Sequence, residues 1–207
     1  MSDVTIYGVG ASTYVRSAVM TCIEKGLDYD FQTVDFTSAE HRKRHPWNRM
    51  PAIRHGDVEL FETSAICRYL DQVGGGDSLQ PSDHVARARM DQWISVLDGY
   101  FYPDAIRGYV LQYIFPGDDG KPDRAAIDAA LPKIKHDLEV LDAAYGKRSW
   151  LVGNSITLAD IMVAPVMAYL PMFPEGKELL GSGFGNVNRA HAAIAERESF
   201  KTATALK

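Results

Sequence analysis

Two hydroxyl side chains, Ser12 and Thr13, stand where an apolar strand pattern gives way to a helical one. In a structural role, such a hydroxyl caps the helix by accepting a backbone N–H bond. In a chemical role, the first-turn N–H groups and the helix dipole would attract an anion, and the hydroxyl could donate to a bound thiolate. Lowering a thiol pKa by about two units requires roughly 2.7 kcal/mol, close to what one charge-assisted hydrogen bond and a helix N-terminus supply.

Met50 and Pro51 form a second candidate, because Pro51 lies in an otherwise strand-like stretch. Proline has no backbone N–H and is excluded from the middle of a sheet. We therefore predict a cis Met50–Pro51 bond at a corner, where the Met50 N–H and C=O could pair with a peptide-like ligand as an added strand. The alternative is an ordinary turn.

Glu62 and Thr63 open the helical pattern that follows a strand-like stretch. As a structural pair they would cap that helix, with the acidic residue first. The same groups could hold an amino-acid head group, whose carboxylate would lie at the helix N-terminus and whose ammonium would pair with Glu62.

A basic run, residues 41–45, lies between these motifs, with Arg49 nearby. It is either a solvated loop or an attractor for a second carboxylate of a small anionic ligand. The net charge of −5 argues against nucleic acid as the main partner. The motifs together describe two helix N-termini and a backbone edge around one peptide with a thiol and two carboxylates. That peptide is glutathione.

The composition is that of an ordinary globular protein, with 46% hydrophobic and 24% charged residues. A length of 207 residues suffices for one large domain or two small ones. No leader pattern or apolar run of about 18 residues is found, so we expect no membrane partner. Cys22 and Cys67 fall in helical patterns without disulfide-framework or metal spacing, so we expect no metal and a reducing cytoplasm.

The first part of the chain alternates between element types. The periodicity predicts strands over residues 4–7 and 29–36 around a helix from Ser12 to Gly26, which makes a parallel βαβ unit. A hairpin over residues 52–61 and a helix over residues 63–72 follow. These elements predict a small α/β domain over residues 1–76.

Beyond the glycine-rich linker after residue 73, we find no strand pattern. The expected helices cover residues 85–115 with a bend at Pro103, 127–141, 161–170 in the core, and 187–200 at the surface. Thr157 and Asp160 form a capping-box pattern before the core helix. Residues 84–207 are therefore expected to form an all-α helical-bundle domain.

The chain resembles the glutathione S-transferase family over essentially its whole length. The matching stretches are IYGVGAST, EKGLDY, PWNRMPAI, ELFETSAICRYLD and WLVGNSITLAD, in this order. The resemblance implies a thioredoxin-like α/β N-terminal domain, an all-α C-terminal domain, a homodimer, glutathione as co-substrate and a role in detoxification. Ser12 matches the thiolate-activating serine of phi-like and related bacterial members.

The same resemblance assigns the other binding residues. Met50, before Pro51, would pair with the cysteinyl backbone, and Glu62 and Thr63 would hold the γ-glutamyl group. The segment between Phe36 and Pro46 is short, so the glycine carboxylate could fall to His41, Lys43 or Arg49. Tyr7 and Thr13 remain alternative thiolate donors.

The leading hypothesis is an enzyme in which a glutathione thiolate attacks an electrophilic or hydroperoxide substrate that is apolar. Tyrosines would line the substrate pocket or belong to the core: Tyr14, Tyr102, Tyr109 and Tyr113. A glutathione or hydrophobic-ligand carrier and a protein-interaction module on the same fold are the alternatives. Trp47 is the expected anchor of the homodimer interface.

Overall fold

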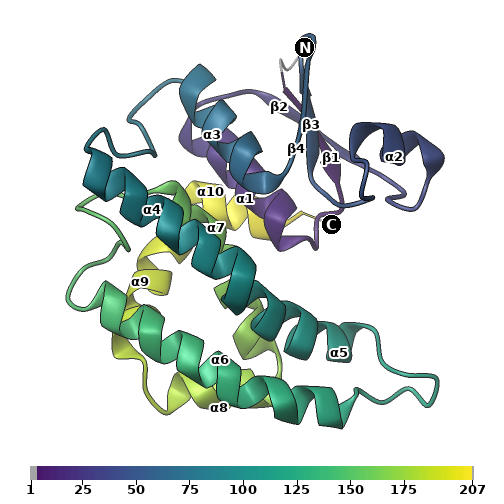
Figure 1. Ribbon diagram of the computed structural model, residues 1–207, viewed down its shortest axis with the longest axis vertical. Coiled ribbons are helices and arrows are strands. Elements are labelled where there is room, and N and C mark those ends of the chain that lie inside the picture. Colours follow the sequence, from purple (N-terminus) through teal and green to yellow (C-terminus); the bar gives the residue numbers. More distant parts are fainter. Residues whose placement is uncertain (1–3, 207) are drawn as a thin grey trace. The chain divides into compact units, whose positions relative to one another are not determined.

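The computed structural model of the protein describes residues 4–206. By their contacts these residues form two compact units, one of residues 4–87 with 195–206 and one of residues 88–194. The first contains a sheet covered by helices, and the second is helical (Figure 1). This confirms the predicted fold class. The last helix of the chain contacts the first unit, although its residues were expected within the helical domain.

The sheet of the first unit is mixed. Its strands are β1 (Val4–Gly8), β2 (Tyr29–Thr33), β3 (Ala52–His55) and β4 (Val58–Phe61). The order is β2-β1-β3-β4, with β2 parallel to β1 and the other neighbours antiparallel. Strand β1 is buried throughout because it lies inside the sheet, whereas the edge strand β2 is partly exposed. The predicted βαβ unit and hairpin are confirmed, although β2 ends before residue 36.

Three helices of the first unit lie side by side. They are α1 (Thr13–Glu24), α3 (Thr63–Val73) and α10 (Glu198–Thr204), with α1 packed against the other two (Figure 1). The Arg197 Nε donates to the Glu24 carboxylate at 2.7 Å, and the Ser199 hydroxyl donates to the same carboxylate. These bonds tie the end of the chain to α1.

The basic run, expected as a loop, forms a short helix, α2 (Ala39–Arg44). Ser38 caps it, because the Ser38 Oγ accepts from the His41 N–H at 3.1 Å. Arg44 pairs with Glu40 one turn earlier at 2.7 Å. The helix therefore forms from its cap and its i,i+4 pair, although its six residues carry little helical periodicity.

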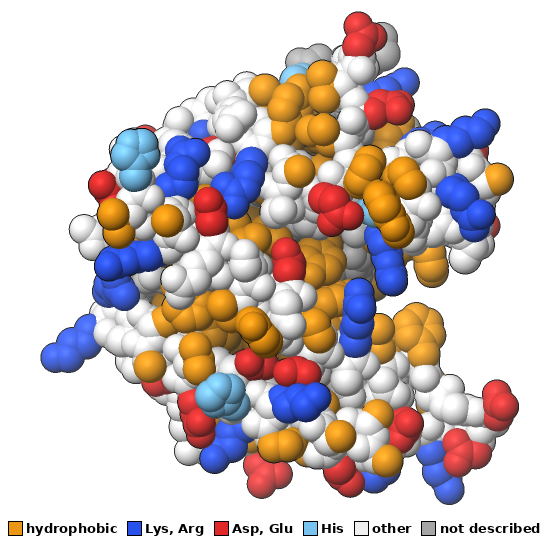
Figure 2. All heavy atoms as spheres, in the orientation of Figure 1, with side chains coloured by type: hydrophobic (Ala, Val, Ile, Leu, Met, Phe, Trp, Pro, Cys, Tyr) orange, Lys and Arg blue, Asp and Glu red, His pale blue; other side chains and the backbone are white. Residues whose placement is uncertain are grey.

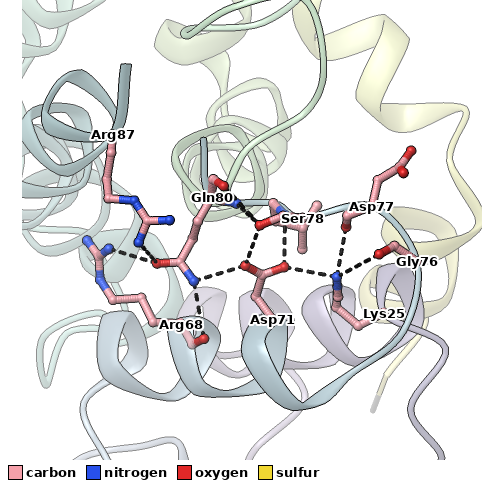
Figure 3. A network of polar contacts seen from close by, with 9 residues as sticks. Lys25, Arg68, Asp71, Gly76, Asp77, Ser78, Gln80 and Arg87 are labelled. Atoms are coloured by element: carbon pink, nitrogen blue, oxygen red, sulfur yellow. Dashed lines mark hydrogen bonds and ion pairs between the residues drawn. The ribbon is translucent and has the colours of Figure 1, made fainter. Parts of the chain in front are cut away.

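A buried polar network holds the segment that follows α3 (Figure 3). The Lys25 Nζ lies 3.1 Å from the Asp71 carboxylate and donates to the Asp77 carbonyl at 2.8 Å. Asp71 also accepts from the Leu79 N–H at 2.8 Å and from the Gln80 amide at 2.9 Å. Burial alone would raise the pKa of Asp71, but the bonds from Leu79, Gln80 and Lys25 outweigh it and lower that pKa. Asp71 is thus an ionised hub joining α1, α3 and the segment.

The second unit consists of helices. The helical elements after residue 83 and before α10 are α4 (His84–Val96), η1 (Leu97–Phe101), η2 (Pro103–Val110), α5 (Leu111–Ile114), α6 (Arg124–Tyr145), α7 (Leu158–Tyr169), η3 (Leu170–Met172), α8 (Pro174–Gly181) and α9 (Gly185–Ala195). The predicted core helix is confirmed, because almost every residue of α7 is buried. The single predicted helix over residues 187–200 is wrong, because α9 ends at Ala195 and Arg197 starts a new helix as the N-cap of α10.

The long helix around Pro103 changes its hydrogen bonding and stays helical. Elements η1 and η2 are π-helical, with Pro103 at the first position of η2. Gly108 of η2 lies against α6, where a Cβ atom would come within 3.0 Å of the Ala130 Cβ. Two small residues thus let η2 and α6 pack closely.

The start of α7 has the predicted capping box. Asp160 is fully buried and accepts from the Thr157 N–H at 2.9 Å, while a second Asp160 oxygen accepts from the Leu151 N–H at 2.8 Å. The pattern therefore fixes both the helix start and the preceding loop.

On the face shown in Figure 2, acidic and basic side chains are interspersed with hydrophobic ones. Among the described residues, 4–206, no helix is long and apolar enough to cross a membrane.

Candidate functional site

Ser12 is the N-cap of α1. Its backbone is extended, and its Oγ accepts from the Val15 N–H at 3.4 Å. An oxygen that accepts in this way keeps its own proton for donation to another group. The first turn of α1 holds no acidic residue, so no carboxylate there opposes a bound anion. The side chain is half-buried, at the point where α1 begins.

The turn before Ser12 is closed by two hydrogen bonds. The Ser12 N–H donates to the Val9 carbonyl at 3.0 Å, and the Arg16 Nε donates to the Gly10 carbonyl at 2.9 Å. Arg16 was not among the predicted site residues. Its position four residues after Ser12, on the same side of the helix, is the pattern that could have identified it.

Met50 lies close to this turn. A Cβ atom at Gly8, the last residue of β1, would come within 2.3 Å of the Val15 Cγ2 and 3.6 Å of the Met50 Cβ. Glycine at position 8 therefore allows β1, α1 and Met50 to meet. The Met50–Pro51 bond is cis, as predicted. Met50 is half-buried and stands two residues before β3.

Glu62 is the N-cap of α3 and adopts a left-handed backbone conformation, with φ of +71°. Such a conformation is uncommon outside glycine and costs of order 1–3 kcal/mol, and it is concentrated at functional sites. The Glu62 side chain is 66% exposed, so its carboxylate is available to solvent and ligands. Thr63, the next residue, is buried.

The structure separates the basic residues assigned to the glycine carboxylate. Arg49 and Lys43 are exposed. His41 is completely buried, and its Nε2 lies 2.7 Å from the Arg49 carbonyl oxygen. The ring therefore contacts the backbone of the loop before Met50 and has no exposed surface for a ligand.

His45 is a second buried histidine, which the loop prediction missed. Its Nε2 lies 3.9 Å from the Glu62 carboxylate, and its ring packs on Phe61 at 5.1 Å between centroids. The i,i+4 spacing of His41 and His45 is the signal that could have placed both rings on one buried face. The Trp47 ring also contacts Phe61, at 5.9 Å between centroids, and Trp47 is 69% exposed.

The two competing hydroxyls lie inside the first unit. Tyr7 is buried in β1, and the Arg44 guanidinium lies 4.3 Å from the centre of its ring. Thr13 is also buried. Of the three candidate hydroxyl residues, only Ser12 is more than marginally exposed.

The two cysteines are buried. Burial, together with the neighbouring Cys67, raises the pKa of the Cys22 thiol to about 12. Cys22 is therefore a neutral packing residue at physiological pH.

The tyrosines assigned to a substrate pocket have different surroundings. Tyr14 is half-buried in the first turn of α1, and Tyr102 is half-buried with Arg107 near its ring. Tyr109 belongs to the core, where its hydroxyl accepts from the Gly176 N–H at 2.8 Å. Tyr109 is thus a core residue, which is one of the two alternatives that the sequence left open for these tyrosines.

Tyr113 is half-buried and takes part in a polar cluster of the helical unit. Its ring stacks on Phe173 at 4.4 Å, and its hydroxyl donates to Glu175 at 2.8 Å. Arg124 pairs with the same carboxylate. Partial burial opposes ionisation of Glu175, but the bonds from Arg124 and Tyr113 lower its pKa to about 2. Within residues 4–206, no cluster of acidic, histidine or cysteine side chains could hold a metal ion.

Comparison with known proteins identifies the family of the chain. The N-terminal domain model of the glutathione S-transferases matches residues 2–72, and the C-terminal domain model matches residues 101–198. Glutathione S-transferase F11 of Arabidopsis thaliana is 30% identical, over 96% of this chain and 95% of its own. Glutathione S-transferase 1 of Zea mays is 29% identical, over 100% of this chain and 98% of its own.

Solved structures agree in the fold. A glutathione S-transferase-I bound with lactoylglutathione has a TM-score of 0.87 and 28% identity, over 99% of both chains. A glutathione S-transferase from Methylobacillus flagellatus with glutathione bound has a TM-score of 0.81 and 28% identity, over 97% of this chain and 98% of that one. The chain therefore belongs to the glutathione S-transferase family, as a transferase of the phi-like type.

Proposed function

We propose that this protein activates glutathione as a thiolate at Ser12 for attack on an apolar electrophile or hydroperoxide in detoxification. The observation that carries the proposal is the position of Ser12. It caps α1 with a hydroxyl that accepts from Val15 and keeps its proton, close to the cis Met50–Pro51 corner. A thiolate at this position would receive the Ser12 hydrogen bond and lie at the positive end of α1.

The chemistry needs no covalent bond to the enzyme. The glutathione sulfur attacks the electrophilic carbon, a carbon–sulfur bond forms, and the leaving group departs with its electron pair. With a hydroperoxide, the sulfur attacks the terminal oxygen, the O–O bond breaks, and the alcohol leaves after taking up a proton. A second glutathione then displaces water from the glutathione sulfenic acid, which gives glutathione disulfide. The proton of the thiol passes to solvent when glutathione binds. Rate enhancement would come from the larger thiolate fraction and from proximity of the two reactants.

The rest of glutathione would follow the edge of the first unit. The Met50 backbone would pair with the cysteinyl residue. The γ-glutamyl carboxylate would lie at the N-terminus of α3, over Thr63, and its ammonium would pair with the exposed Glu62 carboxylate. Arg49, which is exposed, would meet the glycine carboxylate.

The electrophile would contact aromatic side chains. Tyr14 follows Ser12 by two residues and is half-buried. Within the helical unit, Tyr102 and Tyr113 are the candidates for contact with the electrophile, and Tyr109 supports Tyr113 from the core through an edge-to-face contact at 5.7 Å.

We further propose a cytoplasmic homodimer. Trp47 is exposed on the first unit, which has two further exposed apolar residues, Phe36 and Val58. An exposed tryptophan of this kind is a common interface anchor. Two buried cysteines without a disulfide framework are typical of a reducing compartment.

Titration calorimetry with glutathione, followed by turnover with a panel of electrophiles and hydroperoxides, tests the proposal. We expect micromolar to millimolar binding and turnover of at least one panel compound. Binding without turnover would indicate a carrier. The absence of binding would indicate an interaction module and would overturn the proposal.

A further inference from the structure

The binding loop before the cis corner rests on a buried histidine. The His41 Nε2 lies 2.7 Å from the Arg49 carbonyl oxygen, and the ring is completely buried. A carbonyl oxygen can only accept, so the Nε2 must carry the proton. The other ring nitrogen, Nδ1, is buried and has no hydrogen-bond partner among the described residues. The His41 ring therefore makes one defined hydrogen bond, from its Nε2–H to the Arg49 carbonyl.

This bond fixes more than the carbonyl. The Arg49 C=O and the Met50 N–H belong to one planar peptide group and point in opposite directions when the bond is trans. The cis bond found in residues 4–206 is the next one, between Met50 and Pro51. Holding the Arg49 carbonyl on His41 thus aims the Met50 N–H away from α2.

The histidine itself is held firmly. The His45 N–H donates to the His41 carbonyl at 2.8 Å, and the Asn48 N–H donates to the His45 carbonyl at 2.8 Å, which folds the loop back over α2. At the other side, Arg44 lies over the ring of Tyr7 in β1. The helix is therefore tied to the sheet, and the loop is tied to the helix.

We propose that His41 is a positioning residue for glutathione binding, which orients the Met50 N–H through the Arg49 carbonyl without contacting the ligand. The inference rests on the proposed function, because the Met50 N–H is the group that would pair with the cysteinyl backbone. It replaces the expectation that His41 meets the glycine carboxylate directly, which a completely buried ring cannot do.

A matched pair of variants tests the hydrogen bond. In His41→Gln, the side-chain amide nitrogen reaches about as far as Nε2 and can donate to the Arg49 carbonyl. In His41→Met, the side chain has a similar length but no donor. We expect His41→Met to raise the glutathione Kd and KM about fivefold or more, with kcat at saturating glutathione and the bound-thiol pKa unchanged. His41→Gln should restore the Kd to within about twofold of the wild type.

His191→Met, at a half-buried histidine of α9, is the control for a general loss of packing and should leave the glutathione Kd unchanged. If His41→Met does not fold, His41→Asn replaces it, because its amide is one methylene too short to reach the carbonyl. Equal Kd values in the wild type and in the variant that lacks the donor would overturn the inference while the proposed function stands. A fall in kcat or a shift in the bound-thiol pKa would also overturn it.

Glutathione binding to the wild type distinguishes failure of the proposed function from failure of this inference alone. If calorimetry shows no glutathione binding to the wild type, the proposed function fails, and the inference fails with it. Nitrogen-15 NMR of the histidines gives an independent check, in which His41 should show the Nε2–H tautomer. An Nδ1–H tautomer would overturn the inference whatever the variants do.

Discussion

Glu62 combines an exposed carboxylate with a left-handed backbone, φ +71°. We expect Glu62→Gly to leave stability unchanged or raise it by up to about 1 kcal/mol, because glycine adopts this conformation without a Cβ clash. The same variant should lose most of its glutathione affinity, since the ammonium partner is gone. Thermal unfolding and calorimetry measure the two effects.

Glu62→Gln is the control for charge alone. It keeps the backbone strain and should weaken glutathione binding about tenfold at unchanged stability. If Glu62→Gly instead lowers the free energy of unfolding by more than about 1 kcal/mol, the left-handed backbone of Glu62 does not destabilise the native protein.

His45 makes the first unit sensitive to mild acid. Burial lowers its pKa, the nearby Glu62 carboxylate opposes this shift, and His41 and Arg49 add to it. A histidine whose pKa is depressed by folding is neutral in the native state, so stability is full above about pH 6.5, the unfolded value, and falls as the pH drops below it. We expect His45→Gln to flatten the decline in unfolding free energy between about pH 6.5 and 5. If the unfolding free energy of His45→Gln declines as much as that of the wild type, groups other than His45 cause the decline.

Helix starts and prolines leave local signals, so the sequence predicted the helix start at Ser12, the cis bond after Met50 and the helix start at Glu62. The burial of His41 was not predicted, since burial under a loop depends on the tertiary fold and not on the basic run itself. His45 was missed for the same reason.

Among the elements, the segment after α3 depends on one ion pair. The side chains of Lys25 and Asp71 are each 2% exposed. We expect Asp71→Asn to cost about 3–5 kcal/mol, because it leaves the Lys25 ammonium buried without its counter-charge. A double-mutant cycle tests the pair, with the wild type, Lys25→Met, Asp71→Leu and the joint variant. The joint variant should lose much less unfolding free energy than the sum of the losses in the two single variants. Urea unfolding of these four proteins measures the difference.

The pH dependence of the unfolding free energy is a second test of the Lys25–Asp71 pair. Because folding lowers the pKa of Asp71, its contribution is present above about pH 4 and is lost as the pH falls through the folded value. The joint variant should lack that part of the acid destabilisation. Additive costs in the cycle would mean that the pair acts as two independent residues.

Elements with strong periodicity were predicted well, and those fixed by single local contacts were not. The α7 helix has a capping box and an apolar run, which are visible in any sequence. Helix α2 depends on the cap that Ser38 provides. The break before α10 depends on the hydrogen bond from Arg197 to Glu24. The π-helical hydrogen bonding around Pro103 has no periodic signature, because it shifts each bond by one residue within a continuous helix.

For the whole molecule, the proposed dimer predicts a species of about twice 22.9 kDa in sedimentation at micromolar concentration. Trp47→Ala should shift the equilibrium toward the monomer by about tenfold or more, because truncated aromatic anchors commonly cost 2 kcal/mol or more. Met172→Ala removes a comparably exposed apolar residue of the helical unit and is the matched control. A wild type that sediments as a single 22.9 kDa species would contradict the proposal.

The central claim is that Ser12, and not Tyr7, ionises glutathione. Ser12 caps α1 with its proton available, whereas Tyr7 is buried under Arg44. The most direct measurement is an ultraviolet titration of the thiolate of bound glutathione in the wild type, Ser12→Ala and Tyr7→Phe, with unfolding curves to correct for the lost cap. The account predicts that Ser12→Ala raises the bound-thiol pKa by one unit or more, about 1.4 kcal/mol, and lowers neutral-pH turnover roughly tenfold. Tyr7→Phe should leave the titration unchanged, and a pKa shift that follows Tyr7 would contradict the account.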